Sequence, residues 1–473
     1  MSASINTRAT KGVIWSAVDK FGIALMQFLI NMVLARLLIP DDFGVVSMIL
    51  IIVAISTILT DGGFGAALIQ KNDVDESDFS TAFYVNTLVS IILYVVIYAS
   101  APFIALSFNV PILKDILRVL GIVVVINSIG LVPKAQLRRQ LAFKQIAISN
   151  ITAYALSAIV AILMSFYNYG PWSLVGMHIV NALFSNIFIC ISARWWPSRS
   201  FSYISLRRLF AYGEYMLISD ILNNVCFHIQ STLVGKYFSP YTAGQYSQAK
   251  KMEEVACITL PSALNQVLFP LYSRLQHDIT EMTRMLQQNT KMIAFVIFPL
   301  LTILIIVAEP LILFLFGSKW MDSVMYFEVL CVGGFFCSLQ YFNYQAVAAI
   351  GKSKVLFYAG VVKSAFLILS VVIAVHFSLE AVLLAMVLSN VVNYLTNATL
   401  AQIYLKYNVF RQMLDVLPIL LVALAVGGIT HIVYTTFNLN WILTTVLYLF
   451  VYLAVCHFTK NETMTKIIKL IKR

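Results

Sequence analysis

The sequence predicts an all-α polytopic membrane protein with about fourteen transmembrane helices. Of its 473 residues, 60% are hydrophobic and only 11% are charged, whereas a soluble domain carries about 25% charged residues. So few polar residues cannot cover a soluble globule of this size. The apolar residues also fall into long runs, and in lipid such runs must be helices because the backbone has to satisfy its own hydrogen bonds. These observations exclude a soluble enzyme, a secreted domain and a disordered scaffold.

Apolar runs of spanning length follow one another along nearly the whole chain. The fourteen expected spans cover residues 11–38, 43–69, 79–106, 112–132, 143–166, 171–193, 206–238, 241–271, 290–316, 324–350, 355–377, 379–407, 416–437 and 441–458. The connections are too short to hold a separate soluble domain. The first run is too long and too interrupted for a cleavable signal peptide, so we expect it to remain as an anchor.

Basic residues alternate between two sets of predicted loops. One set, which includes both termini, holds most of the Lys and Arg residues, and the other holds only Arg36, Lys114, Lys236 and Lys319. Cytoplasmic loops collect Lys and Arg. We therefore expect a multi-pass protein of the plasma (inner) membrane with an even number of spans and both termini in the cytoplasm. Topology then explains most of the net charge of +11, and no nucleic-acid partner is expected.

Two predicted outer connections, residues 34–47 and 234–247, share a pattern at one fixed offset. The matched pairs are Arg36/Lys236, Pro40/Pro240, Gly44/Gly244 and Ser47/Ser247. Chance is one explanation, because Pro and Gly are common in tight loops. The other is a duplicated six-helix unit, which would be a parallel repeat because six is even. It predicts an N-terminal six-helix lobe over residues 1–200, a C-terminal six-helix lobe over 201–410, and two extra helices with a basic tail over 411–473.

Ionisable residues inside spans are costly and tend to face a cavity or one another. The basic candidates for a substrate cavity are Lys20, Lys250, Lys251, Lys363, Arg36 and Lys236. The acidic candidates for ion coupling or charge balance are Asp19, Asp61, Asp220, Glu253 and Glu254. A cavity with a basic surplus would suit a phosphate or pyrophosphate group. The alternative is that these charges only neutralise one another, for example through an i,i+4 pair between Lys250 and Glu254.

The second expected span contains the segment Asp61-Gly62-Gly63-Phe64-Gly65. Glycine permits unusual backbone angles and close packing. The segment is therefore interpreted either as a hinge or as an ordinary helix terminus, and the sequence does not separate the two.

Motifs for metal, cofactor or nucleotide chemistry are missing from the sequence. The six cysteines form no C-x-x-C pair, and the six histidines have no metal-ligand spacing. No G-x-x-x-x-G-K-[ST] motif occurs, so this chain is not expected to hydrolyse ATP. We therefore expect no cofactor, no metal, no catalytic residues and no enzymatic activity.

Five segments, at residues 34–44, 61–70, 243–249, 268–276 and 316–320, carry a resemblance to a known family. They read LARLLIPDDFG, DGGFGAALIQ, AGQYSQA, LFPLYSRLQ and FGSKW. In this order and spacing the chain resembles the polysaccharide repeat-unit flippases, of the O-antigen, lipopolysaccharide and colanic-acid type. These belong to the multidrug/oligosaccharidyl-lipid/polysaccharide exporter superfamily.

The resemblance implies a V-shaped transporter of two six-helix lobes plus two extra helices. It implies that an undecaprenyl-pyrophosphate-linked oligosaccharide moves from the cytoplasmic to the outer leaflet, for lipopolysaccharide or exopolysaccharide biosynthesis. Alternating access, a charged central cavity and an ion gradient would accomplish this. The implied partners are the lipid-linked oligosaccharide, the bilayer, and a polysaccharide polymerase with its chain-length machinery.

Four other classes compete with this interpretation. A drug or metabolite-cation antiporter of the same superfamily would share the architecture. A membrane enzyme would be expected to hold reacting groups on long loops, and a channel to contain a filter loop. A twelve-helix facilitator would carry a Gly- and Arg-rich second loop, where this chain has the mostly acidic residues 71–78.

Overall fold

The structure is a computed structural model that describes residues 2–71, 73–259, 261, 268, 271–458 and 463–464 of the chain. Side chains are described within these ranges except at residues 2–14, 17, 211–216 and 258. Most of the predicted basic tail lies outside the described residues, as do Phe269 and Pro270 of the family-like segment at 268–276. The described chain divides into two compact units, residues 1–244 and 245–473, and each is described by itself.

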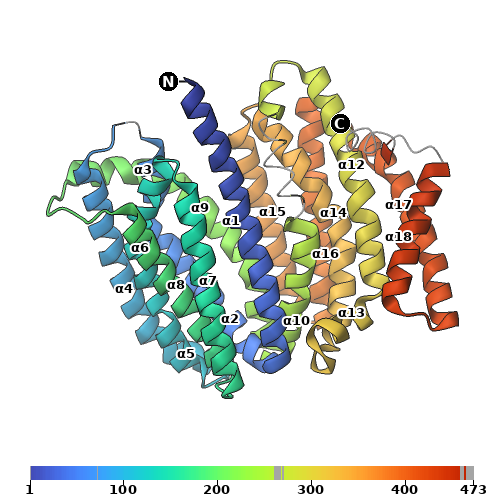
Figure 1. The fold of residues 1–473 in the computed structure, drawn as a ribbon, viewed down its shortest axis with the longest axis horizontal. Coiled ribbons are helices and arrows are strands. Elements are labelled where there is room, and N and C mark those ends of the chain that lie inside the picture. Colours follow the sequence, from blue (N-terminus) through green and yellow to red (C-terminus); the bar gives the residue numbers. More distant parts are fainter. Residues whose placement is uncertain are drawn as a thin grey trace. The chain divides into compact units, whose positions relative to one another are not determined.

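The first unit is built from long helices that lie side by side (Figure 1). Its elements are α1 (Ser2–Leu37), α2 (Pro40–Asp61), α3 (Phe64–Gln70), α4 (Glu76–Phe108), α5 (Leu113–Leu120), α6 (Ile122–Arg139), α7 (Phe143–Phe166), α8 (Trp172–Ala193), α9 (Tyr203–Tyr237) and the start of α10 (Pro240–Glu254). Helix α7 packs against both α1 and α8, α6 packs against α4 and α8, and α2 packs against α9. The short helices α3 and α5 lie at opposite ends of the long ones (Figure 1).

The second unit continues α10 and contains the remaining helices. These are a π-helix, η1 (Val255–Thr259), then α12 (Ile279–Ile306), α13 (Ala308–Phe316), the 3-10 helix η2 (Ser318–Trp320), α14 (Ser323–Ala349), α15 (Ser353–Ala374), α16 (Leu379–Leu405), α17 (Val409–Phe437) and α18 (Trp441–Phe458). Helix α14 lies between α12 and α16, with which it makes its largest interfaces. Helices α17 and α18 pack against each other and against α12.

Within the described residues, twelve helices are long and apolar enough to cross a membrane. On helix α15, for example, the apolar residues Tyr358, Val362, Leu369 and Ile373 are each between 59% and 63% exposed. Apolar faces of this size are not tolerated in water and are the expected lipid contact of a membrane helix. The predicted all-α, multi-pass membrane architecture is therefore confirmed.

The expected count of fourteen spans is approximate. The expected spans at 206–238 and 241–271 are not among the twelve. Helix α9, in the first of these regions, is continuous, but polar residues such as Asp220 and His228 interrupt its apolar sequence. Helix α10 in the second region has only 15 residues before the π-helix begins.

Three expected spans are divided into two helices. The run at 112–132 forms α5 and α6, which meet at Gly121, and the run at 290–316 forms α12 and α13, which meet at Val307. The run at 43–69 breaks because Gly62 and Gly63 both have left-handed backbone angles, with φ of 54° and 76°. Few residues other than glycine adopt this conformation at low cost. Of the two interpretations of this segment, it forms a helix terminus in this structure.

Many helices begin with capping groups that the sequence provides. Pro40 stands at the first turn of α2, where its missing N–H costs nothing, and the Ile39 N–H donates to Asp42 Oδ2 at 3.2 Å. Ser202, Asp278, Ser378 and Asn408 accept backbone N–H groups at the starts of α9, α12, α16 and α17. These side chains satisfy donors that the first helical turn leaves without partners, which fixes where each helix begins.

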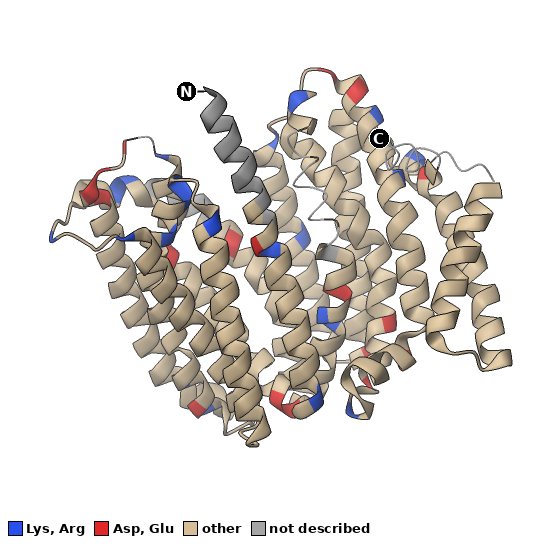
Figure 2. Ribbon diagram, viewed as in Figure 1, with Lys and Arg blue, Asp and Glu red and all other residues tan. Residues whose placement is uncertain are grey.

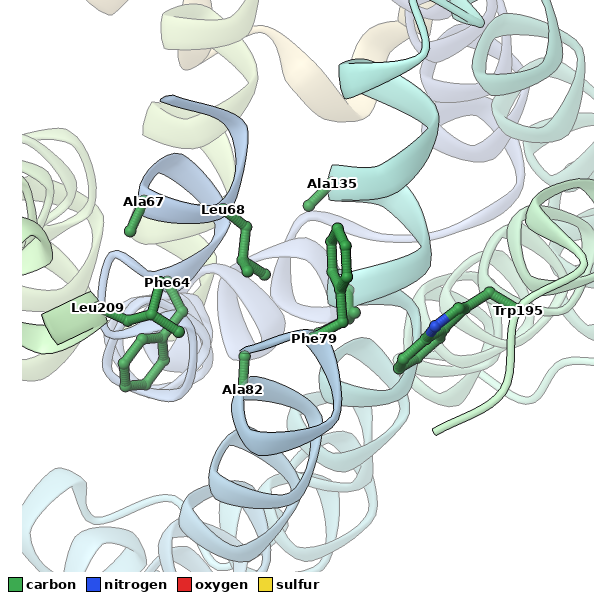
Figure 3. Packing of buried hydrophobic residues seen from close by; sticks show 9 residues of the cluster. Phe64, Ala67, Leu68, Phe79, Ala82, Ala135, Trp195 and Leu209 are labelled. Carbon is green, nitrogen blue, oxygen red and sulfur yellow. The ribbon is translucent and has the colours of Figure 1, made fainter. Parts of the chain in front are cut away.

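One hydrophobic cluster ties α3 into the first unit. Its buried members are Phe64, Ala67, Leu68, Phe79, Ala82, Val132, Ala135, Trp195 and Leu209. Figure 3 shows Phe79 between Ala135 and Trp195, with Leu209 beside Phe64. The Trp195 Nε1–H donates to Glu76 Oε1 at 2.8 Å, so the polar edge of this ring is satisfied as well. The segment after the glycine pair is thereby packed against α4, α6 and the start of α9.

Candidate functional site

The turn that follows α2 is closed by Asp61. The Gly65 N–H donates to Asp61 Oδ1 at 2.9 Å, which satisfies one of the donors at the start of α3. Gly62 N–H in turn donates to the Ile58 carbonyl at the end of α2. Asp61 therefore has a structural role in the turn, whatever further role its second oxygen has.

Asp19, in the middle of α1, is held by a chain of polar groups on neighbouring helices. The Asn150 amide on α7 donates to Asp19 Oδ1 at 3.1 Å. The Ser185 hydroxyl on α8 donates to Asn150 Oδ1 at 2.9 Å. The chain orients Asn150 so that its N–H₂ faces the carboxylate, and Asp19 is thereby linked to three helices of the first unit.

Two basic residues of α6 join these acidic groups. Lys134 and Arg138 lie one helical turn apart, and Lys134 interacts electrostatically with Asp19 while Arg138 interacts with Asp61. Asp220 on α9 also acts electrostatically on Asp61. The structure thus brings five charged residues together through electrostatic interactions. We call them the unit 1 cluster, and its members are Asp19, Asp61, Lys134, Arg138 and Asp220.

The remaining basic candidates of the first unit lie elsewhere on α1 and α9. Lys20 is exposed on α1, and Arg36 is exposed near the end of the same helix. Lys236, near the end of α9, lies 5.7 Å from the centre of the Phe108 ring and 6.0 Å from that of Tyr237. Such cation–π contacts are typical of a basic side chain at a helix end.

The second unit holds an ion pair within α10. Lys250 Nζ lies 2.7 Å from Glu253 Oε2, so Lys250 pairs at i,i+3 and not with Glu254 at the i,i+4 spacing that the sequence permits. Lys251 is exposed on the same helix, and it interacts electrostatically with Glu254, which is half-buried. The four charged residues therefore occupy one short stretch of helix, which ends where the π-helix begins.

Lys363 occupies a separate polar site in the second unit. Its Nζ donates to Asn397 Oδ1 on α16 at 2.9 Å and lies 5.8 Å from the centre of the Tyr344 ring on α14. No carboxylate lies within 4 Å of this ammonium group among the described residues. Lys363 is thus a half-buried cation held by an amide oxygen and an aromatic face.

The structure gathers some of the predicted site residues and leaves others apart. Asp19, Asp61 and Asp220 lie in the unit 1 cluster, and Lys250, Lys251, Glu253 and Glu254 lie together on α10. Figure 2 shows that most other charged residues are near the helix ends. Sequence reasoning did not identify Lys134 and Arg138 as site residues, because it assigned them to a cytoplasmic loop. Their i,i+4 spacing next to Pro133 was the available signal.

Helices α2 and α10 begin in direct backbone contact. An ideal Cβ atom on Gly44 would lie 1.7 Å from the Pro240 carbonyl oxygen, and one on Gly244 would lie 1.9 Å from the Pro40 carbonyl oxygen. Both distances are far below van der Waals contact, so only glycine fits at either position. The residues that the sequence matches at one offset therefore contact each other reciprocally.

Comparison with known proteins identifies the family. The model of the family described as "Polysaccharide biosynthesis protein" matches residues 33–325. The chain belongs to this family. The resemblance carried by the five sequence segments is thereby confirmed at the level of the family.

Several relatives align over most of the length of this chain. The teichuronic acid biosynthesis protein TuaB of Bacillus subtilis is 26% identical over 435 residues, covering 90% of this chain and 88% of TuaB. The succinoglycan biosynthesis transport protein ExoT of Rhizobium meliloti is 26% identical and covers 68% of this chain and 65% of its own. The lipopolysaccharide biosynthesis protein WzxC of Escherichia coli is 22% identical, with 70% and 68% covered.

Solved structures share the fold. The lipid II flippase MurJ in an inward closed conformation aligns with a TM-score of 0.79 at 15% identity, covering 95% of this chain and 99% of MurJ. An inward-facing multidrug resistance transporter of the MATE family aligns with a TM-score of 0.63 at 16% identity, covering 82% and 98%. The relatives and structural neighbours whose names state an activity are transporters or flippases, and at 15–16% identity the solved structures show that this chain shares their fold.

Proposed function

We propose that this transporter flips an undecaprenyl-pyrophosphate-linked oligosaccharide repeat unit from the cytoplasmic to the outer leaflet of the plasma membrane. The product would enter lipopolysaccharide or exopolysaccharide biosynthesis, and alternating access coupled to an ion gradient would move it. The observation that carries the proposal is that this chain holds basic residues within its helices, above all Lys134 on α6, Lys250 on α10 and Lys363 on α15. Ammonium groups at such positions can hold a pyrophosphate by charge-assisted hydrogen bonds.

The relatives and the fold support the class of substrate. The names of TuaB, ExoT and WzxC refer to the biosynthesis of teichuronic acid, succinoglycan and lipopolysaccharide, and MurJ is named as a flippase of lipid II. Each name applies to that protein alone. Names that combine polysaccharide biosynthesis with the flipping of a lipid favour a lipid-linked polysaccharide precursor as the cargo here.

Several further features belong to the same proposal. Both termini would lie in the cytoplasm, as the loop charges predict. The repeat of residues 1–200 and 201–410 would provide two six-helix lobes, with residues 411–473 as an appendix. The acidic members of the unit 1 cluster would take part in ion coupling, and a polymerase with chain-length machinery would receive the flipped product.

Deletion and complementation in the source organism test this function. A clean deletion should leave lipid-linked repeat units on the inner leaflet and abolish the surface polysaccharide, and the wild-type gene should restore it. Normal polysaccharide in a deletion strain that has no paralogue would contradict the proposal.

Charge reversal tests the basic residues directly. The substitutions Lys134→Glu, Lys250→Glu and Lys363→Glu should each lower export at normal protein levels. Arg284→Glu is a matched control, because Arg284 is 69% exposed and lies 3.7 Å from Glu281 in a surface pair. Normal export and stability in all three reversals would refute a basic cavity.

A drug or metabolite-cation antiporter is the second candidate, favoured by the MATE fold neighbour and by the acidic groups of the unit 1 cluster. Susceptibility of the deletion strain to cationic dyes separates the two functions. Increased susceptibility together with unchanged polysaccharide would favour the antiporter.

A further inference from the structure

The Lys250–Glu253 pair is asymmetric in its exposure. The Lys250 side chain is 19% exposed, whereas that of Glu253 is 1% exposed. Glu253 Oε2 accepts the Lys250 ammonium at 2.7 Å. The other oxygen, Oε1, is buried and has no hydrogen-bond partner among the described residues. A ligand at the surface of this unit can therefore contact the Lys250 ammonium, whereas it cannot contact the Glu253 carboxylate.

The described groups that face the Lys250–Glu253 pair include no second cation, since Lys251 interacts with Glu254. Tyr246 and Glu254 face the pair from α10, Cys257 faces it from the π-helix, and Cys331, Cys337 and Tyr341 face it from α14. Thiols and phenols are neutral near neutral pH, and the Glu254 carboxyl group is not a cation in either protonation state. Among the described residues, Lys250 is the only cation within 4 Å of Glu253.

The π-helix holds this arrangement in place. Cys257, in the π-helix Val255–Thr259, projects against α14 at Gly334, where an ideal Cβ atom would lie 2.4 Å from the Cys257 sulfur. A larger residue at 334 would push this sulfur aside, so the Cys257 side chain packs closely against α14. Single π-turns of this kind are frequent at functional sites. Glu253 therefore has little freedom to follow Lys250 if Lys250 turns toward a ligand.

We propose that the pyrophosphate of the substrate and Glu253 compete for Lys250, so that substrate binding adds one proton to Glu253. The inference rests on the proposed function, because it requires an anionic substrate. A buried carboxylate that loses its cation is strongly disfavoured as an anion. The Lys250 ammonium passes its proton to Glu253 Oε2, 2.7 Å away, and regains a proton from the surrounding solution. The ion pair then opens, and Lys250 Nζ donates to a pyrophosphate oxygen. Release of the substrate reverses both steps and restores the neutral pair.

This exchange has a defined direction. The proton binds together with the substrate, so the Lys250–Glu253 pair does not supply the opposing ion movement that would drive export. That role falls to the carboxylates of the unit 1 cluster. The pair would instead keep Lys250 neutralised whenever the transporter is empty.

Binding measured at several pH values tests the exchange. Undecaprenyl pyrophosphate is titrated onto the purified full-length transporter in nanodiscs at pH 6, 7 and 8. If one proton is taken up per ligand, linkage requires the affinity to fall with rising pH, by up to about tenfold per pH unit. In Glu253→Gln, the affinity for undecaprenyl pyrophosphate should stay high. Its remaining pH dependence should come only from ionisation of the pyrophosphate, which affects every variant equally.

Three control variants separate this role from a structural one. Lys291 Nζ and Asp415 Oδ1 form a second, partly buried ion pair in this unit, at 2.9 Å. Asp415→Asn removes the acid of that pair, and this variant should keep the wild-type pH profile. Glu254→Gln should also keep it. The double variant Lys250→Gln/Glu253→Gln leaves no unpaired buried charge, so it should fold and bind weakly at every pH.

The outcomes distinguish the two proposals. If the wild type binds and Glu253→Gln retains the wild-type pH profile, or if Glu254→Gln loses it instead, the competition is refuted while the proposed function stands. A flat profile in the wild type also refutes it. If the wild type binds no undecaprenyl pyrophosphate at any pH, the proposed function fails and the exchange fails with it.

Discussion

Lys71 and Asp78 form an ion pair across the turn between α3 and α4. The Asp78 side chain is only 1% exposed, and its Oδ2 also accepts the Asp75 N–H at 3.2 Å. The pair joins the end of the α3 segment to the first turn of α4, beside the cluster that contains Phe79 and Trp195. A buried carboxylate here depends on one lysine for its charge balance.

Loss of this lysine should therefore destabilise the protein strongly. Lys71→Met leaves Asp78 buried without a cation, which costs about 3–5 kcal/mol in comparable pairs. Thermal unfolding in detergent measures the change. Arg284→Ala, at the exposed pair with Glu281, should cost about 0–1 kcal/mol. Equal effects of the two substitutions would show that burial of Asp78 is not what matters.

Alanine at Gly44 should not be accommodated in the contact between α2 and α10. Its Cβ would meet the Pro240 carbonyl oxygen at 1.7 Å, so the two helix starts must separate. We expect Gly44→Ala to abolish export and to lower stability by about 1–3 kcal/mol, as overpacking does elsewhere. Export assays and thermal unfolding check this.

Glycines with free space provide the matched control for Gly44→Ala. Gly360 and Gly428 lie in helices with nothing within 4 Å of an added Cβ. Alanine at either position should be neutral or stabilising, because glycine costs roughly 0.5–1 kcal/mol in a helix. Loss of export in Gly360→Ala as well would mean that helix propensity, and not the close contact, explains Gly44→Ala.

The start of α17 should depend on Gln412. Its side chain is fully buried, it accepts from Asn343 Nδ2 on α14 at 2.9 Å, and it donates to the Tyr407 carbonyl at 3.0 Å. Gln412→Leu leaves both partners unsatisfied, each at a cost of about 1–3 kcal/mol. Thermal unfolding should show the loss, and Gln412→Glu should be no less destabilising, because it buries a carboxylate and removes the donor to the Tyr407 carbonyl. A neutral Gln412→Leu would refute the anchoring role.

The turn after α2 should require glycine at position 63. Gly63 has a φ of 76°, and left-handed angles cost a residue with a Cβ roughly 1–2 kcal/mol. Gly63→Ala should lower the free energy of unfolding by about this amount, and Gly63→Asn by less, because asparagine tolerates this conformation better. Equal stability of the alanine and asparagine variants would contradict this account.

The sequence predicts the helices better than their interruptions. Long apolar runs establish a membrane protein, and the glycine pair at 62–63 signals the break after α2. The break at Val307 carries no comparable signal, because its neighbours are as apolar as the helices on either side. This break depends on how α13 packs against its neighbours, which the amino-acid sequence alone does not show.

The sequence predicts which residues form the charged site on α10, but it does not predict which of them pair. Lys250 has carboxylates at i+3 and i+4, and both spacings bring side chains together on a helix. Burial of Glu253 against α14 decides between them, and burial is a tertiary property. Lys134 was predicted to lie in a loop, whereas it lies in α6, which continues to Arg139. The alternation of loop charges assigns a residue to one side of the membrane, but it does not give the residue's depth.

The reciprocal contact of Gly44 and Gly244 limits how this chain can evolve. On each side the neighbour is a main-chain carbonyl, which is present whatever residue occupies position 40 or 240. A second substitution at the contacting residue therefore cannot make room for a larger side chain, as it often can between two side chains. Suppressors of Gly44→Ala should arise elsewhere, by tilting a helix, and the two glycines are expected to be retained together in descendants of this sequence.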